Sequence, residues 1–272
     1  MSINRPLKKE VVFASIITVI MSVMNISGLP AALFVNIEVL DIGPLYFSLM
    51  VNFLPTALIF FIGWKTFYPN WSFGLGGNGF ITGIKKYGLS GILIFAVSSF
   101  TFCVGLYPFN YEPTILKVLI EGFIYYIGVA IIEELYIRGL LLNIIEKLFG
   151  KNKKATIYAI ITSSVIFGMG HIFGILGSSL LSIIGKVVWT IGLGLYLGSI
   201  YKKTNNLWVP IALHAVIDFC AWPFCFSTTP PYPEVSLWIL LITYLGVGGY
   251  GCYIMLNKKN PPLVFKVKGE QK

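Results

Sequence analysis

Two adjacent glutamates and an arginine lie within the longest apolar stretch of the sequence, in the run EELYIR at residues 133–138. Residues 115–142 are nearly all apolar, so a helix through them would carry Glu133, Glu134 and Arg138 into the interior of a lipid bilayer. An ionisable side chain there costs about 2.5–3.5 kcal/mol on insertion scales and therefore marks a candidate functional site. Its partners must be sought elsewhere in the chain.

Helical spacing separates the two glutamates. Glu134 and Arg138 are four positions apart, share one helix face and can form an ion pair. Glu133 is rotated by about 100° from Glu134 and points elsewhere. A buried ion pair is more often structural than catalytic, because removal of one partner strands the other charge. We therefore expect the pair to fix the helix and to leave the Glu133 carboxylate free for chemistry.

The chain contains two histidines, and each stands in a pair with helical spacing. Phe167 and His171 are four positions apart, so the phenyl ring can pack against the imidazole. His214 and Asp218 repeat this spacing, so both can face one cavity. A single membrane histidine is usually a hydrogen-bonded contact between helices, whereas a shared depth with Glu133 favours a functional role.

Composition identifies the kind of protein that holds these residues. Of the 272 residues, 56% are hydrophobic and 11% are charged, whereas a soluble globular domain has about 25% charged residues. We expect a single all-α membrane domain over residues 1–272, with a basic cytoplasmic tail at 257–272. The net charge of +9 comes from short clusters between apolar runs, so we predict no nucleic-acid partner. The four cysteines lack CxxC spacing and are expected to be ordinary helix residues.

Eight apolar segments could form a polytopic helical bundle, since a bilayer of about 30 Å needs about 20 residues per helix. They cover residues 11–35, 44–64, 87–106, 113–149, 155–171, 180–201, 207–226 and 235–256. The glycine-rich segment 65–86 is expected to be a loop or an interfacial segment. All basic residues except Lys117, Arg138 and Lys186 fall on one side of the membrane, which identifies that side as cytoplasmic. We predict about eight transmembrane helices, both termini in the cytoplasm, and a first span that is retained rather than cleaved.

This topology places the polar residues at one depth. Glu133 and His171 lie 18 and 17 residues from lysines of the loop that joins their helices, or about 25 Å along each helix. Asp218 lies about 22 Å along its own helix, and His214 lies one turn nearer the cytoplasm. The four side chains are therefore expected to meet in one layer that is reached from the cytoplasmic side.

The three motifs, in this order, resemble the CPBP family of intramembrane proteases, also called the Abi or type II CAAX prenyl endopeptidase family. The motifs are EELYIR, FGMGH at residues 167–171 and HAVID at residues 214–218, and the resemblance covers a core at residues 123–220. It implies a bundle of about eight membrane helices and a glutamate-activated water. Many bacterial members carry aspartate at the position of Asp218, where the eukaryotic CAAX-processing branch has asparagine. Proteolysis is therefore better supported than prenyl-protein processing.

The same residues can be assigned roles from chemistry alone. Peptide hydrolysis needs a base that activates water and donors where the oxyanion develops. Glu133, removed from water in the membrane, is a stronger base there and with His171 could hold and deprotonate one water. His214 is then placed to stabilise the oxyanion, and Asp218 can orient its ring or donate a second hydrogen bond. Glu134, Arg138 and Phe167 are expected to have positioning or packing roles.

Other readings of the residues remain open. Zinc could be held by Glu133, His171 and His214 with an open water position, but the chain lacks HExxH, so we predict no metal and rank zinc second. Carboxylates and histidines in a bundle also suit a proton-coupled transporter, although the sequence has no internal repeat. A catalytically silent scaffold is a third possibility. We expect a cell-membrane endopeptidase that cuts a membrane-associated peptide or CAAX-like protein from the cytoplasmic leaflet.

Overall fold

The computed structural model describes Lys9 and residues 44–150, 152–175, 177–227 and 234–257. Over these ranges the chain is helical and contains no strand. The first predicted span, residues 11–35, lies outside the described residues, and so does the basic tail beyond Asn257. The orientation of both termini therefore stays a prediction.

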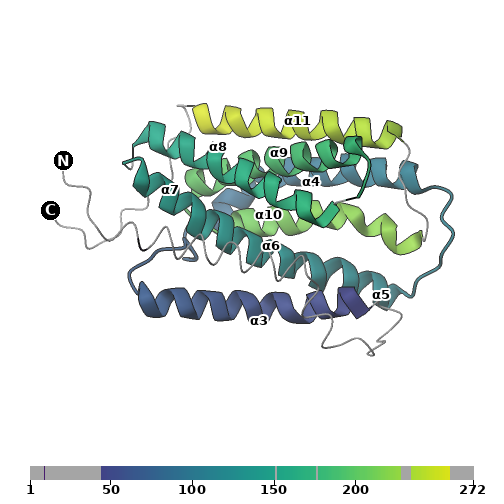
Figure 1. Ribbon diagram of the computed structural model, residues 1–272, viewed down its shortest axis with the longest axis horizontal. Helices are drawn as coiled ribbons and strands as arrows, with labels where there is room; N and C mark the ends of the chain where they lie inside the picture. The colour runs from purple at the N-terminus through teal and green to yellow at the C-terminus, as the bar shows by residue number, and fades with distance from the viewer. Residues whose placement is uncertain (1–8, 10–43, 151, 176, 228–233, 258–272) are drawn as a thin grey trace.

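Long helices lie side by side along one axis of the molecule (Figure 1). They are α3 (Pro44–Phe67), α4 (Phe80–Leu106), α8 (Lys153–Gly170), α9 (Leu180–Thr204), α10 (Trp208–Asp218) and α11 (Glu234–Leu256). A composite helix runs through α5 (Ile115–Leu119), η1 (Ile120–Tyr125), α6 (Tyr126–Glu134), η2 (Leu135–Leu142) and α7 (Asn143–Leu148). Short 3-10 helices follow α8 and α10, namely η3 (His171–Ile175) and η4 (Phe219–Phe226). Helix α9 occupies the middle of the bundle, where it contacts α4, α8, α10 and α11.

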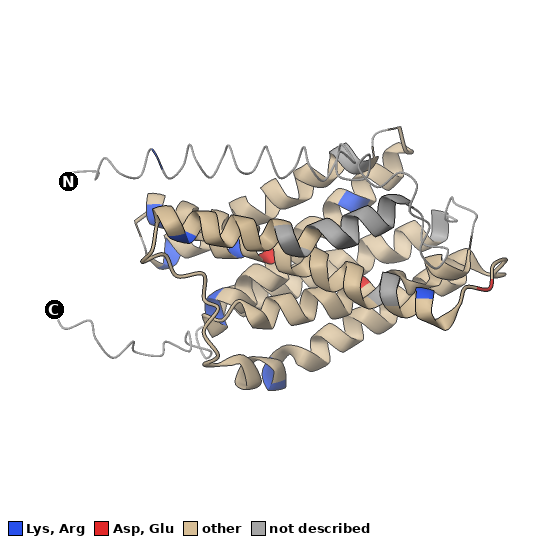
Figure 2. Cartoon of the chain, turned by 90° about the horizontal axis from the view of Figure 1, so that it is seen from below, with Lys and Arg blue, Asp and Glu red and all other residues tan. Residues whose placement is uncertain are grey.

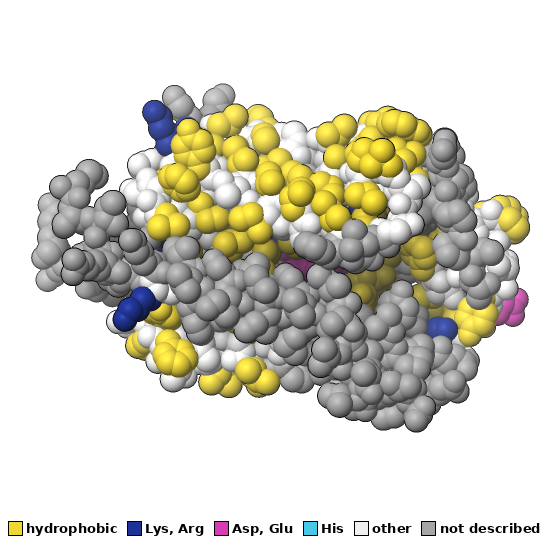
Figure 3. Space-filling model, in the orientation of Figure 1, with side chains coloured by type: hydrophobic (Ala, Val, Ile, Leu, Met, Phe, Trp, Pro, Cys, Tyr) yellow, Lys and Arg dark blue, Asp and Glu magenta, His cyan; other side chains and the backbone are white. Residues whose placement is uncertain are grey.

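The predicted spans that fall within the described ranges all appear as helical segments. Five of the described helices are long and apolar enough to cross a membrane: 80–106, 115–148, 180–204, 208–226 and 236–256. Helix α3 contributes a shorter apolar helix over Thr56–Phe67, and α8 begins with two lysines and falls outside the set. Hydrophobic side chains spread over the visible face of the bundle (Figure 3). These features indicate a multi-pass membrane protein, while the count of eight spans stays a prediction.

The segment predicted as a loop at residues 65–86 is shorter in the structure, because α4 begins at Phe80 rather than near Tyr87. Gly79 precedes the helix with a φ of 84°, a left-handed conformation that glycine adopts without strain. The remaining connection is anchored by Asn206, whose side-chain nitrogen donates to the carbonyl oxygens of Gly76 at 2.6 Å and Asn78 at 2.9 Å. The loop is therefore tied to the turn between α9 and α10.

Small residues bring α9 close to its neighbours. A Cβ atom on Gly194 would lie 2.8 Å from Cβ of Ser164 on α8, and one on Gly192 would lie 2.2 Å from the carbonyl oxygen of Tyr244 on α11. These distances are below normal carbon and oxygen contacts. These glycines therefore let α9 approach α8 and α11 closely.

The composite helix has 34 residues, or about 51 Å if it were wholly α-helical. The sequence requires such a helix to tilt, kink or project beyond the bilayer. Two stretches of it, η1 and η2, are π-helical, a winding that is often found at functional sites. In η2 the carbonyl oxygen of Gly139 accepts hydrogen bonds from Nε1 of Trp71 at 3.0 Å and Nδ2 of Asn143 at 2.9 Å. Side chains thus stabilise the irregular backbone that follows Glu134.

Most of the described basic residues lie at one end of the bundle, where α7 is followed by α8 (Figure 2). We call this region the basic end; it comprises Lys65 of α3, Lys85 and Lys86 of α4, Lys147 of α7, Lys153 and Lys154 of α8, and Lys202 and Lys203 of α9. These lysines come from five helices that alternate in direction. Because the helices alternate in direction, their lysine-bearing ends lie on the same side of the bundle. The predicted topology depends on this pattern.

Candidate active site

The carboxylate of Glu134 is fully buried and faces the next turn of its own helix. Nη1 of Arg138 lies 2.7 Å from Oε1 of Glu134, and the two side chains have relative exposures of 1% and 0%. The guanidinium also lies over the ring of Phe167, with Cζ 4.8 Å from the ring centroid. The ion pair predicted from the four-residue spacing is present.

His214 is held by carboxylates on both sides of its ring. Its Nδ1 atom lies 2.7 Å from Oε1 of Glu134, the same oxygen that accepts from Arg138. Its Nε2 atom lies 3.2 Å from Oδ2 of Asp218 and 3.7 Å from Oε2 of Glu133. The contact with Asp218 follows from the helical spacing, whereas the contact with Glu134 was not predicted from the sequence.

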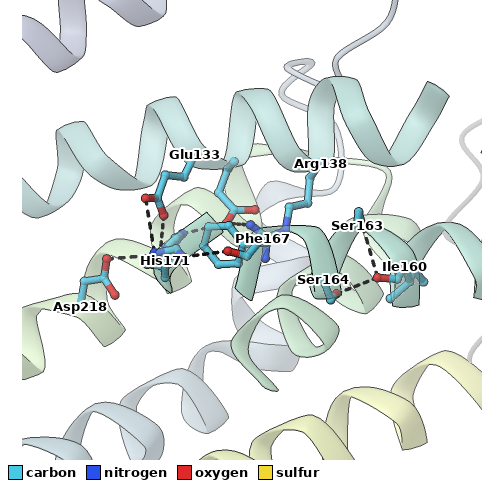
Figure 4. Close-up of polar contacts among 10 residues, drawn as sticks. Glu133, Arg138, Ile160, Ser163, Ser164, Phe167, His171 and Asp218 are labelled. Atoms are coloured by element: carbon cyan, nitrogen blue, oxygen red, sulfur yellow. Dashed lines mark hydrogen bonds and ion pairs between the residues drawn. The ribbon is translucent and has the colours of Figure 1, made fainter. Parts of the chain in front are cut away.

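Glu133 lies beside both histidines, and it approaches the His214 ring at Nε2, whereas Glu134 approaches it at Nδ1 (Figure 4). Its Oε1 atom is 3.9 Å from Nε2 of His171, and the two side chains are 23% and 24% exposed. His171 Nδ1 lies 2.8 Å from the carbonyl oxygen of Phe167, to which it can donate. Nε2 of His171 is then left with its lone pair directed toward Glu133. The gap is too long for a direct hydrogen bond and short enough for one water to bridge.

Phe167 packs between the two histidines. Its ring centroid lies 4.7 Å from that of His171 with an interplanar angle of 83°, and 6.3 Å from that of His214. The predicted packing of Phe167 on His171 is confirmed, and the same ring also covers Arg138. One aromatic side chain therefore contacts both imidazoles and the buried cation.

Irregular backbone carries the polar groups of the site. His171 stands where α8 gives way to η3, and Asp218 is the last residue of α10 before η4, which contains Pro223. Glu134 ends α6 where η2 begins. At membrane depth such irregular segments are tolerated where they are buried in protein or line a wet cavity. The space-filling view shows an acidic side chain between the helices near the middle of the bundle (Figure 3).

The residues described above all fall within one segment that can be compared with known families. They are Glu133, Glu134, Arg138, Phe167, His171, His214 and Asp218. Residues 115–220 match the Rce1-like family of type II CAAX prenyl endopeptidases. This match confirms the resemblance seen in the three motifs. No curated protein and no solved structure matches the chain at a significant level. This segment is therefore similar to a family of peptidases, and the apolar helices indicate a multi-pass membrane protein.

The zinc alternative can be compared with the contacts of the two histidines. A zinc ligand set would need a free nitrogen lone pair from each histidine directed at the ion. Both ring nitrogens of His214 instead lie within hydrogen-bonding distance of a carboxylate, Glu134 on one side and Asp218 on the other. Within the described ranges, no group of three His, Cys, Asp or Glu side chains is arranged to hold a metal ion.

Other nucleophilic side chains near these residues are hydrogen-bonded or buried. Ser163 and Ser164 donate their hydroxyl hydrogens to the carbonyl oxygen of Ile160 at 3.2 and 2.7 Å (Figure 4). Cys220 is buried, and all four cysteines of the chain are free thiols. All four lie in helices, namely α4, η4 and α11, as expected from the sequence.

A polar network at the basic end of the Rce1-like segment was missed by sequence reasoning. Nζ of Lys202 donates to Oε2 of Glu146 at 2.6 Å and to Oδ1 of Asn143 at 2.7 Å. Thr156 donates to Oε1 of Glu146 at 2.5 Å, and Nδ2 of Asn143 donates to the hydroxyl of Tyr201 at 2.8 Å. The network joins α7, α8 and α9 at their ends. Asn143 and Glu146, polar residues beside an apolar span, were the available signal.

Proposed function

We propose that the protein is an intramembrane endopeptidase that hydrolyses a peptide bond in a membrane-associated peptide or CAAX-like protein. The observation that carries the proposal is the position of Glu133. Its carboxylate lies 3.9 Å from Nε2 of His171 and 3.7 Å from Nε2 of His214, while the other nitrogen of each ring is fixed by a separate acceptor. A base, a water site and a hydrogen-bond donor are thereby brought to one place.

Glu133 and His171 hold the attacking water in this mechanism. Nδ1 of His171 donates to the Phe167 carbonyl, so its Nε2 accepts a hydrogen bond from the water. Glu133 takes the other proton of the water as its oxygen attacks the peptide carbonyl carbon. The protonated carboxyl then gives this proton to the leaving amine as the C–N bond breaks. General acid–base catalysis of this kind contributes about 10²- to 10⁴-fold to the rate.

His214 stabilises the oxyanion. Its Nδ1–H group donates to Glu134, which fixes the plane of the ring and directs Nε2–H toward Glu133 and Asp218. The carbonyl oxygen of the substrate gains negative charge in the tetrahedral intermediate and accepts from Nε2–H. Removal of one such donor typically costs about 10²- to 10³-fold in kcat.

Glu134 and Arg138 are positioning residues in this proposal. Oε1 of Glu134 accepts from Arg138 and from His214, so one carboxylate connects the catalytic helix to α10. Asp218 fixes the far side of the His214 ring. The mechanism uses no metal, in line with the engagement of both His214 nitrogens.

The proposed location is the cell membrane, with entry to the site from the side that carries the basic end. Cytoplasmic loops of membrane proteins are enriched in Lys and Arg. The lysines of α3, α4, α7, α8 and α9 gather at one end of the bundle (Figure 2). The substrate would then reach Glu133 from the cytoplasmic leaflet.

Cleavage by the reconstituted protein tests the proposed function. Wild type, Glu133→Gln and Glu112→Gln are placed in liposomes with two fluorogenic peptides, one with a farnesylated CAAX-type cysteine and one tethered by an acyl chain. Glu112 is an exposed carboxylate outside the site and serves as the matched control. We expect Glu133→Gln to lose at least about 100-fold in kcat and Glu112→Gln to cleave as wild type does.

The same assay with a metal chelator tests the metal-free mechanism. Unchanged cleavage is expected after dialysis against the chelator. Loss of cleavage that zinc restores would contradict the mechanism, and equal cleavage by wild type and Glu133→Gln would remove Glu133 from it. Failure of wild type to cut either peptide would contradict the proposed substrate class.

A further inference from the structure

Lys186 is a cationic side chain inside an apolar span, and the proposed mechanism does not use it. It lies on α9, in the apolar stretch from Leu180 to Thr204, about 9 Å along the helix from Leu180. Its side chain is only partly exposed. Ionisable residues at such positions are costly to place and by default indicate function.

Packing between α8 and α9 places Lys186 level with His171. A Cβ on Gly168 would lie 3.1 Å from the carbonyl oxygen of Val187 and 2.4 Å from Cγ1 of Ile191. The two helices run in opposite directions, so the residues that follow Gly168 lie beside those that precede Val187. His171 is three positions after Gly168, and Lys186 immediately precedes Val187.

The charge of Lys186 acts on the site. Its ammonium interacts electrostatically with Glu133, His171 and Cys220.

The Lys186 ammonium contacts the aromatic ring of Trp189. Nζ lies 4.5 Å from the ring centroid of Trp189, a cation–π contact. The Trp189 ring is itself packed on Phe102 at 5.6 Å and on Tyr244 at 4.9 Å between centroids. Over the ranges that the structure describes, Lys186 has no carboxylate within ion-pair distance, whereas Arg138 is paired with Glu134. The positive charge thus remains available to a ligand.

We propose that Lys186 forms an anion subsite beside Glu133 and His171 and binds a carboxylate of the peptide substrate. This inference rests on the proposed function. The carboxylate can be the free C-terminus of the substrate or an acidic side chain, because an ammonium group recognises both in the same way. Binding there would place the scissile bond against the water held by Glu133 and His171, and would select substrates that carry the negative charge.

Peptide binding measured without cleavage tests the inference. Three fluorescent peptides of one sequence are titrated onto purified Glu133→Gln protein: one with a free C-terminus, one amidated, and one amidated that carries a single glutamate. The same titrations are made with Lys186→Met and Lys186→Arg added to Glu133→Gln. Lys117→Met serves as the matched control, because Lys117 also stacks on an aromatic ring, that of Tyr111, at 4.8 Å.

At least one carboxylate peptide is expected to bind about tenfold more tightly than the neutral amide, the size expected for one charge-assisted hydrogen bond. Lys186→Met abolishes this preference, whereas Lys186→Arg and Lys117→Met keep it. The peptide that shows the preference identifies the source of the carboxylate. Equal binding of all three peptides to Glu133→Gln protein, or a preference that survives Lys186→Met, overturns the inference.

The outcomes of the two tests are separable. A carboxylate preference in Glu133→Gln protein, together with a wild type that cleaves nothing, would retain the anion subsite and reject the peptidase. Cleavage by wild type, together with binding that ignores the carboxylate, would retain the peptidase and reject the role of Lys186.

Discussion

The Nδ1 atom of His214 lies 2.7 Å from Oε1 of Glu134, although 80 positions separate the two residues in the chain. The same oxygen accepts from Arg138. Glu134 is therefore more than the partner of a structural arginine, since it fixes the ring that faces Glu133. Because one oxygen serves both contacts, mutations can separate the structural role of Glu134 from its proposed role in catalysis.

Glu134→Gln is expected to reduce both stability and kcat, because the amide leaves the Arg138 guanidinium buried without its counter-charge. Breaking a buried ion pair on one side costs about 3–5 kcal/mol. The double variant Glu134→Gln with Arg138→Met should recover most of this stability and little of kcat, since His214 still lacks a charged acceptor. Thermal unfolding in detergent and cleavage kinetics measure the two effects. Recovery of kcat along with stability would show that Glu134 acts only through folding.

Asp218→Asn should retain activity within about tenfold of wild type, because its side-chain oxygen can still accept the hydrogen bond from Nε2–H of His214, a contact worth about 1 kcal/mol when both partners are present. Asp218→Leu removes the acceptor and should lower kcat by a larger factor, with little change in KM. Steady-state measurements of kcat and KM for both variants test this prediction. If Asp218→Leu cleaves as well as Asp218→Asn, then Asp218 has no positioning role.

Gly192→Ala should destabilise the bundle, because its Cβ would lie 2.2 Å from the carbonyl oxygen of Tyr244 and force α9 away from α11. Overpacking of this kind costs about 1–3 kcal/mol. Gly246→Ala on α11 is the matched control, since its Cβ meets no atom within 4 Å. The control should be neutral or stabilising, because alanine is the better helix former. The comparison is made by thermal unfolding in one detergent, and equal melting temperatures would contradict the described packing.

Lys202→Met should destabilise the basic end, because it leaves the Glu146 carboxylate without its 2.6 Å partner. The pair is about one-fifth exposed, so the expected cost is modest, about 1 kcal/mol after solvent screening. Adding Glu146→Gln should restore part of that loss. A double-mutant cycle on unfolding free energies measures the coupling. A coupling energy of zero would mean that the two side chains act independently.

Much of the helical arrangement could be predicted from periodicity and apolar length, because a bilayer admits few alternatives. The spans between residues 44 and 256 were expected, and the Glu134–Arg138 and Phe167–His171 contacts follow from four-residue spacing within one helix. The early start of α4 at Phe80 was not predicted, because a glycine such as Gly79 is compatible with a loop and with the start of a helix.

Contacts between helices were harder to predict than contacts within one helix. Spacing along α6 shows that Glu134 faces Arg138, but the rotation of α10 that brings His214 to the same oxygen depends on packing against several other helices. The network of Lys202, Glu146 and Asn143 likewise depends on how three helix ends meet. Lys186 was visible in the sequence as an isolated charge, yet its approach to His171 becomes clear only when Gly168 is seen against Val187.

The winding of the composite helix makes the number of residues in η2 as important as their identity. A π-helical turn has hydrogen bonds from i to i+5, so it accommodates an extra residue relative to an α-helix. Loss of one residue between positions 139 and 142 would let the stretch relax to α-helix and turn everything upstream of it by about 100° relative to the end held by Asn143. Glu133 would then face lipid or a neighbouring helix although every motif letter were intact. The number of residues in η2 therefore sets the direction in which the Glu133 carboxylate points. A chain with the same motifs and one residue fewer in this segment would place that carboxylate differently.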